Sequence, residues 1–124
     1  MINPVLIAEG FPLDLELIAG ADHVFPLELV FIDSGLPADF SGCSGWLQAR
    51  HPDADGAVVF ELTGGDFTFS ATLPNVQWRV SAAKSLLAGR RTLVYDLWVS
   101  WPDGQERRLC YGKTRPTARV TRNG

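Results

Sequence analysis

Few side chains in this sequence could do chemistry near neutral pH, and those few are scattered. The imidazoles of His23 and His51 are the groups that titrate closest to neutrality. A Ser-His-Asp or Cys-His set needs partners around the histidine, and neither histidine has such partners nearby in the sequence. The chain also has no Gly-x-Ser-x-Gly nucleophile elbow. We therefore expect surface histidines and no enzymatic activity.

Two short motifs resemble ligand-binding loops but are incomplete. Residues 53–56, Asp-Ala-Asp-Gly, look like part of a calcium loop, yet Glu61 is too close to serve as its terminal ligand. Residues 64–66, Gly-Gly-Asp, lack the strand-to-helix setting of a phosphate loop. Cys43 and Cys110 are far apart and form no Cys-x-x-Cys motif. We expect hairpin turns, two reduced thiols with one disulfide as the alternative, and no metal or cofactor.

The C-terminal part of the chain is rich in cations, with tryptophan and tyrosine nearby. Nucleic-acid binding would need such cations on one face, interleaved with aromatic rings. The net charge of the chain is −3, however, and neighbouring residues on a strand point to opposite faces. The pattern therefore favours a solvated face or an interface with an acidic partner over nucleic acid. The cations are Arg107, Arg108, Lys113, Arg115, Arg119 and Arg122.

Charge is divided unevenly between the two halves of the sequence. Residues 1–66 carry eleven of the fourteen acids and one base, whereas residues 67–124 carry ten of the eleven bases. Two arrangements follow. Strands from the two halves interleave and mix the charges, or the molecule has an acidic side and a basic side. The second arrangement would let copies pack head to tail, and a closed ring is the usual result.

Hydrophobic alternation with a period of two is the strongest structural signal. Leu93, Tyr95, Leu97 and Val99 alternate with more polar residues, and residues 102–104, Pro-Asp-Gly, then form a turn before a second alternating run. This pattern predicts a β-hairpin. Similar runs predict further strands over residues 14–18, 23–32, 43–50, 57–62, 67–69, 76–80 and 114–121. Pro26 indicates an edge strand or a bulge.

The elements together predict an all-β protein. Residues 81–89 are the one helical passage, with Ser81 as its N-cap and Gly89 at its end. About seven or eight short strands with turn residues between them are typical of an antiparallel immunoglobulin-like β-sandwich. We expect an extended N-terminal arm over residues 1–13 and a single sandwich domain over residues 14–124. The chain has no apolar run that would span a membrane and no secretory signal pattern, so we expect no membrane partner and a cytoplasmic origin.

Two tryptophans are the best candidates for a contact surface. If Leu47 and Leu97 face the core, alternation places Trp46 and Trp98 on the outside, and exposed aromatic residues are enriched at interfaces. The alternative is that the arm or a long loop covers one of them. The arm itself is apolar and would let a neighbour's sheet gain a strand. Its apolar residues are Val5, Leu6, Ile7, Phe11 and Leu13.

Several short motifs, taken in order, carry a family resemblance. They are Asp14-Leu15-Glu16-Leu17, Phe25-Pro26-Leu27, Phe40-Ser41-Gly42, Arg50-His51-Pro52-Asp53, Leu87-Ala88-Gly89, Tyr95-Asp96-Leu97, and Pro102-Asp103-Gly104 followed by Gly112. Across residues 14–120 the chain resembles the immunoglobulin-like β-sandwich domains of tailed-phage virion proteins, notably the N-terminal domain of phage baseplate upper proteins. The resemblance implies a non-enzymatic structural subunit of a virion, without a cofactor, assembled in the bacterial host cytoplasm.

On this hypothesis the protein acts in a tail, baseplate or head through contacts with other virion proteins and with copies of itself. The residues expected at such contacts are Val5, Leu6, Ile7, Phe11, Leu13, Trp46, Trp98, Arg107, Arg108, Arg115 and Arg119. The alternative is a small carbohydrate- or ligand-binding module that uses the exposed tryptophan faces against sugar rings.

Overall fold

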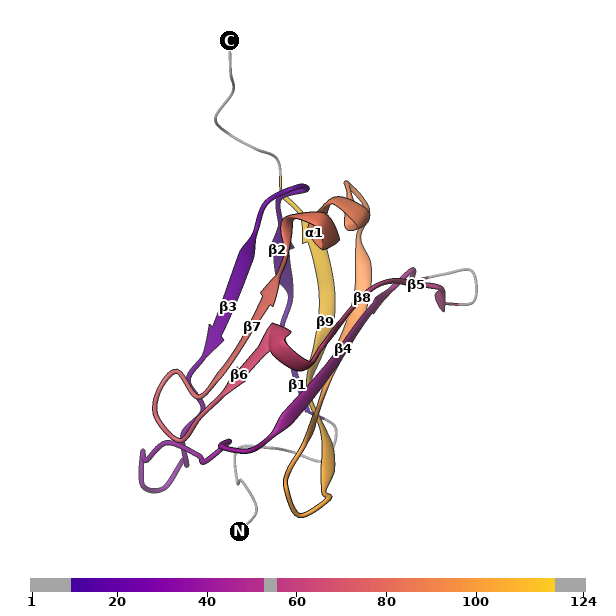
Figure 1. Cartoon of the computed structure of the whole chain (residues 1–124). Helices are drawn as coiled ribbons and strands as arrows, with labels where there is room; N and C mark the ends of the chain where they lie inside the picture. The colour runs from indigo at the N-terminus through magenta and orange to yellow at the C-terminus, as the bar shows by residue number, and fades with distance from the viewer. Residues whose placement is uncertain (1–9, 53–55, 118–124) are drawn as a thin grey trace.

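The protein is a sandwich of two β-sheets packed face to face (Figure 1). The computed structural model describes residues 10–52 and 56–117. In this part of the chain, one sheet has six strands and the other has three. One α-helix, α1 (Ala82–Ala88), lies at one end of the sandwich. The all-β sandwich predicted from the alternating residues is confirmed.

The larger sheet is built around the predicted C-terminal hairpin. Its order is β1-β9-β8-β4-β5, and β2 pairs with the same side of β9 as β1. β1 and β2 run parallel to β9, whereas the other strands of this sheet are antiparallel neighbours. The antiparallel sandwich expected from the sequence therefore carries two short parallel strands at one edge. The strands are β1 (Phe11–Pro12), β2 (Leu15–Leu17), β4 (Ser44–Arg50), β5 (Val58–Thr63), β8 (Leu93–Ser100) and β9 (Glu106–Pro116).

The smaller sheet has the order β3-β7-β6 and is antiparallel throughout. Its strands are β3 (His23–Leu27), β6 (Phe67–Phe69) and β7 (Val76–Val80). Pro26 lies on β3, which is an edge strand, so the missing backbone N–H of proline breaks no ladder in the sheet. The edge position predicted for Pro26 is confirmed.

The strand order is that of an immunoglobulin-like sandwich. If β3 to β9 are taken as strands B, C, C′, D, E, F and G, the sheets read G-F-C-C′ and B-E-D. β1 and β2 then extend the first sheet beyond strand G. Cys43 and Cys110 are both free thiols, so no disulfide links the sheets as it does in antibody domains.

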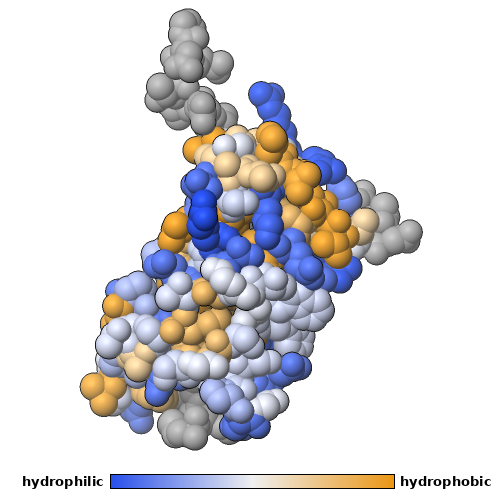
Figure 2. All heavy atoms as spheres, in the orientation of Figure 1, coloured by the Kyte–Doolittle hydropathy of each residue, from blue (hydrophilic) through white to orange (hydrophobic). Residues whose placement is uncertain are grey.

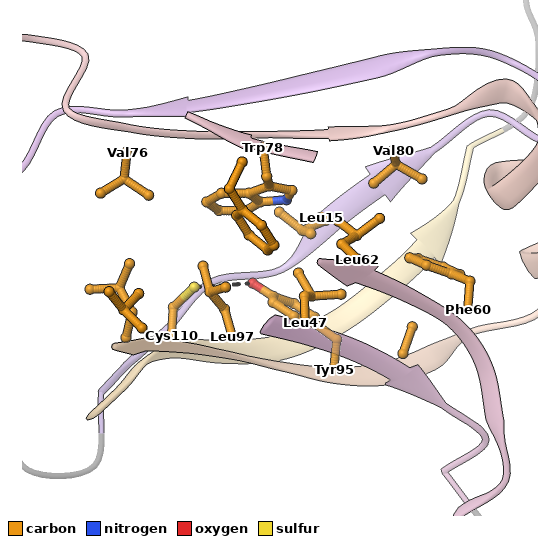
Figure 3. Packing of buried hydrophobic residues seen from close by; sticks show 14 of the residues in the cluster. Leu15, Leu47, Phe60, Leu62, Val76, Trp78, Val80, Tyr95, Leu97 and Cys110 are labelled. Atoms are coloured by element: carbon orange, nitrogen blue, oxygen red, sulfur yellow. Dashed lines mark hydrogen bonds between the residues drawn. The ribbon is translucent and has the colours of Figure 1, made fainter. Parts of the chain in front are cut away.

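The core lies between the inner faces of the two sheets (Figure 3). The smaller sheet contributes Trp78, which is 1% exposed, and the larger sheet contributes Leu47 and Leu97 opposite it. All four inward residues predicted for β8 are buried, namely Leu93, Tyr95, Leu97 and Val99. Alternation was therefore sufficient to identify the buried face of this strand.

The helix forms where the sequence predicted it. The Ser81 side chain accepts a hydrogen bond from the Lys84 backbone N–H, and the helix ends at Gly89, whose φ is 60°. The buried hydroxyl of Ser85 donates to the Ala21 carbonyl at 2.7 Å and accepts from the Gly20 backbone N–H at 3.1 Å. These bonds fasten α1 to the turn that precedes β3.

Two predicted strand boundaries are wrong. The strand expected over residues 23–32 ends at Leu27. The backbone N–H groups that follow it do not bond to a neighbouring strand but to the Asn75 side chain and to a carbonyl within a tight turn. Leu29 N donates to Asn75 Oδ1, and Phe31 N donates to the Leu36 carbonyl. The last strand expected over residues 114–121 is not separate, because β9 runs unbroken to Pro116; residues 118–121 lie outside the described part.

The acidic and basic halves of the sequence interleave in space. Each of the three ion pairs among the described residues joins an acid from residues 1–66 to a base from residues 67–124. Because strands of both halves share each sheet, the two halves do not form separate acidic and basic sides. The pairs are Asp14–Arg115, Asp22–Arg79 and Asp66–Lys84, with N–O distances of 3.2, 3.0 and 3.3 Å.

Candidate functional site

The predicted interface tryptophans meet on the outer face of the six-stranded sheet. Trp46 on β4 lies directly opposite Trp98 on β8, and Gln48 lies opposite Asp96 in the same pair of strands. Because successive side chains on a strand point to opposite faces, all four project away from the core. We call this surface the tryptophan face and define it as Trp46, Gln48, Arg50, Glu61, Asp96, Trp98, Arg108 and Tyr111.

Both tryptophans are exposed, and hydrogen bonds fix both indole rings. Trp46 is 49% exposed and Trp98 is 41% exposed, which confirms that they face outward. The indole N–H of Trp46 donates to Glu61 Oε2 at 2.5 Å, and that of Trp98 donates to Asp96 Oδ2 at 3.3 Å. The rings therefore keep one orientation while much of their apolar surface stays in water.

A chain of hydrogen bonds continues from Trp46 across β5 and β4. The Glu61 carboxylate also accepts from Gln48 Nε2 at 2.8 Å, and the side-chain oxygen Oε1 of Gln48 accepts from the Arg50 guanidinium. Arg50 in turn donates to the Gly56 carbonyl at 2.9 Å. The bonds from Gln48 and Trp46 lower the pKa of Glu61, so its carboxylate stays ionised at neutral pH and holds its donors.

Strand β9 places a cation and an aromatic ring beside Trp98. The pairing of β8 and β9 shifts by one residue, so that Leu97 lies opposite Cys110 while Trp98 lies opposite Arg108. This bulge turns Arg108 to the outer face next to Trp98. The Arg108 guanidinium also stacks over the Tyr111 ring, 4.3 Å from its centroid. Such a contact combines cation–π attraction with a flat, partly apolar surface.

The tryptophan face is hollowed rather than flat. One hollow, with a volume of about 460 Å³, extends from Asp96 toward Tyr111 and Lys113. An adjoining hollow of about 270 Å³ lies between Trp46 and Trp98. Because the two share lining residues, they form one continuous depression across β4, β8 and β9. The shared residues are Gln48, Arg50 and Asp96.

The other predicted cations are not gathered at the tryptophans. Arg107 lies opposite Val99, on the other side of the strand from Arg108. Arg115 forms an ion pair with Asp14, and Asp14 Oδ1 accepts from the Lys113 backbone N–H at 3.0 Å. That backbone bond and then the Arg115 bond lower the pKa of Asp14. Arg115 therefore helps to fasten the N-terminal segment to β9.

The predicted arm is partly incorporated into the protein's own sheet. Phe11 in β1 lies opposite Cys110, and both Phe11 and Leu13 are half-buried against the core. The Tyr95 hydroxyl donates to the Leu13 carbonyl at 2.5 Å, which holds this segment in place. Val5, Leu6, Ile7 and Arg119 lie outside the described residues. A contact between the arm and a neighbouring subunit stays a prediction.

The side chains with possible chemistry are occupied with structural contacts. His23 Nε2 accepts from the Ile18 backbone N–H at 2.9 Å, and His51 Nε2 lies 3.1 Å from an Arg91 guanidinium nitrogen. Burial raises the pKa of the Cys43 thiol to about 11 and that of Cys110 to about 12. Within residues 10–52 and 56–117, no group of three or more His, Cys, Asp or Glu side chains is placed to hold a metal ion.

Sequence reasoning missed the carboxylates that hold the tryptophans. Glu61 lies on β5 opposite Gln48, so its bond to Trp46 depends on the register between two strands joined by a loop. Asp96 lies two residues before Trp98 on the same strand, so alternation puts both side chains on the outer face. That spacing on one strand was the signal that could have identified it as a partner of the indole N–H.

The chain matches no protein-family model and shows no significant similarity to a curated protein. In the described part of the chain, none of the helical segments is long and apolar enough to cross a membrane.

Proposed function

We propose that this protein is a non-enzymatic structural subunit whose tryptophan face binds another protein of a larger assembly. The observation that carries the proposal is the pair Trp46–Trp98, side by side, exposed, and each held by a carboxylate. Fixed aromatic rings lose little conformational entropy on binding, and Trp, Tyr and Arg dominate the binding energy of protein interfaces. Arg108 and Tyr111, which lie on the same face as the two tryptophans, supply an arginine and a tyrosine.

We infer that the assembly is a bacteriophage or phage-like particle, in which the protein has a place in the tail, the baseplate or the head. The support is the order of sequence motifs shared with immunoglobulin-like domains of tailed-phage virion proteins. An immunoglobulin-like strand order is compatible with that resemblance. On this proposal the partners are other virion proteins, and the protein is assembled into particles in the bacterial host cytoplasm.

The test measures how much of a double variant, Trp46→Ala with Trp98→Ala, is incorporated into particles. Particles from the phage or strain that encodes the chain are purified and the subunit is quantified by mass spectrometry. We expect at least about tenfold fewer copies per particle, because truncation of two central aromatic residues costs several kcal/mol. Circular dichroism checks that the variant folds.

Val24→Ala is the matched control for this experiment. Val24 is 53% exposed but lies on β3, on the other sheet of the sandwich. This variant should be incorporated like the wild type. Undiminished incorporation of the folded double-tryptophan variant would overturn the proposed interface, and absence of the wild-type chain from purified particles would overturn the virion assignment.

A carbohydrate-binding module is the second candidate, and the polar lining of the depression favours it. Gln48 and Asp96 lie within reach of the exposed indole faces, and sugar recognition combines stacking on such faces with hydrogen bonds to hydroxyl groups. Titration of the protein with oligosaccharides tests this candidate through tryptophan fluorescence. A saturable fluorescence change that is lost in Trp98→Ala would support carbohydrate binding. An unchanged fluorescence spectrum across glucans, galactans and amino-sugar polymers would reject it.

A further inference from the structure

Two exposed apolar patches lie at opposite ends of the sandwich, away from the tryptophan face. The helix patch consists of Leu86, Leu87 and Arg90, and its leucines are 64% and 56% exposed. The tip patch consists of Ile32, Asp33 and Leu36, with Ile32 86% exposed and Leu36 62% exposed. Figure 2 shows apolar atoms both around α1 and at the loop that follows β3. Neither patch belongs to the core or to the proposed interface.

The register of β3 and β7 explains why these patches are at opposite ends. His23 pairs with Val80, just before α1, whereas Leu27 pairs with Val76 at the other end of the two strands. Directly after Leu27 the chain enters the tip loop, residues 28–37, which carries the tip patch. One patch therefore lies at each end of the long axis of the molecule, as Figure 1 also shows.

The tip patch is held in a defined shape. Phe31 N donates to the Leu36 carbonyl at 2.9 Å, and Gly35 N donates to the Phe31 carbonyl at 2.8 Å. Val30 and Pro37 form an antiparallel bridge below this turn. The turn thus holds Ile32 and Leu36 on a structured loop, where both apolar side chains are exposed to water and do not pack into the core of their own chain.

The helix patch is equally well defined. Ser85 and Ala88 are the buried residues of α1, so Leu86 and Leu87 lie on the side of the helix that faces away from the protein. The Arg91 guanidinium donates to the Leu87 carbonyl at 2.6 Å and stabilises the last turn. The exposed leucines are therefore presented by a capped helix end.

The charged residues next to the two patches in the sequence have opposite signs. Asp33 belongs to the tip patch, Glu28 and Asp39 flank it in the sequence, and none of the three is in an ion pair with a described residue. Arg90 belongs to the helix patch and Arg91 follows it directly, and neither is in an ion pair with a described residue. Asp22, the acid that bonds to the first turn of α1, is already paired with Arg79. An apolar patch with acids at one end thus complements an apolar patch with arginines at the other.

From this complementarity we propose that the protein self-associates head to tail, with the tip patch of one copy bound to the helix patch of the next. The contact joins two different surfaces, so it is heterologous and builds a ring or a filament rather than a closed two-fold dimer. Ile32 and Leu36 gain burial against Leu86 and Leu87, while Asp33 approaches Arg90. The proposal does not depend on the tryptophan face, which stays free for another partner.

A charge-swap experiment with the full chain tests the direction of packing. The first variant combines Leu86→Asp with Arg90→Glu, and the second combines Ile32→Lys with Asp33→Lys. Analytical ultracentrifugation should show concentration-dependent association of the wild type that weakens as salt rises. Each variant alone should have a self-association Kd at least about tenfold higher, because its two ends now repel.

The mixture of the two variants gives the decisive result. The unchanged tip of the first variant can bind the unchanged helix end of the second, so an equimolar mixture should contain heterodimers that form with near wild-type affinity. The mutated ends of the two variants carry opposite charges, so longer complexes would hold the two variants in alternation. Trp98→Ala should self-associate like the wild type. A wild-type protein that stays monomeric at all concentrations, a single variant that associates normally, or a mixture without heterodimers would overturn the proposal. Loss of association in Trp98→Ala would place the contact on the tryptophan face instead.

Discussion

Trp46 and Trp98 lie directly opposite each other on β4 and β8, and each indole N–H is bound by a carboxylate of the same sheet face. A solitary exposed tryptophan needs no special explanation, because apolar atoms make up much of any protein surface. Two adjacent indoles differ from a solitary one, because Glu61 and Asp96 hold their exposed apolar faces side by side on one surface. This arrangement is the basis of the proposed function.

The bond between Glu61 and Trp46 should depend on pH. Gln48 and Trp46 hold the pKa of the Glu61 carboxyl below its ordinary value of 4.5. Protonation of Glu61 is therefore less favourable in the folded chain than in the unfolded chain. The bonds from Gln48 and Trp46 stabilise the fold at pH values above 4.5, and this stabilisation is lost as the pH falls through the lower pKa of the folded state. NMR of the Trp46 indole N–H should show a transition with a midpoint below 4.5. Glu61→Gln should abolish this transition, and a midpoint at or above 4.5 would contradict the assignment.

Gly112 should be essential for the parallel pairing of the N-terminal segment with β9. A Cβ atom at this position would lie 2.4 Å from the Leu13 carbonyl oxygen and 2.8 Å from Asp14 Oδ1. Gly112→Ala should therefore push this segment away and lower the free energy of unfolding by about 2 kcal/mol. Urea denaturation measures the change. Gly65→Ala is the control, because nothing lies within 4 Å of its added Cβ, and its effect should stay below about 1 kcal/mol. Equal effects in the two variants would count against the close contact.

Asn75 should stabilise the tip loop and the fold together. Its fully buried side chain accepts from Leu29 N and donates to the carbonyls of Leu29 and Ala38 at 2.7 and 2.8 Å. Asn75→Ala leaves these buried backbone groups without partners and should cost about 2–3 kcal/mol in thermal or urea unfolding. Thr72→Ala, at an exposed position of the neighbouring loop, should change stability by less than about 0.5 kcal/mol. A mild effect at Asn75 would mean that water replaces its bonds.

Both cysteines should be unreactive thiols in the native protein. Burial raises the pKa of Cys43 from 9.0 to about 11, which leaves about a hundredfold less thiolate near neutral pH than in a free cysteine. Cys110 is fully buried, and burial raises its pKa to about 12. A thiol reagent should therefore label the native chain very slowly. After denaturation without a reductant it should label both thiols at once, and fewer than two reactive thiols would reveal a disulfide.

The local pattern of the sequence was enough to predict which side chains point inward and which point outward. Period-two alternation in β4 and β8 placed Leu47 and Leu97 in the core and Trp46 and Trp98 outside, because strand geometry alone dictates that alternation. The same local reasoning located α1 from Ser81 and Gly89 and the hairpin from its Pro-Asp-Gly turn. These features depend on neighbours in the sequence.

Features that depend on distant neighbours could not be predicted in this way. The parallel pairing of β1 and β2 with β9 joins segments from opposite ends of the described chain. The bulge that brings Arg108 beside Trp98 lies within the hairpin, but it is a shift of register that side-chain alternation does not reveal. The Glu61–Trp46 bond also depends on strand register. The positions of the charges depend on strand pairing too, since the two halves of the sequence differ in charge but both contribute strands to each sheet. By itself, then, the sequence determined the class of fold and the faces of its strands, because both follow from local backbone geometry. Only the tertiary structure decided which side chains meet, because long-range strand pairing depends on how the whole core packs.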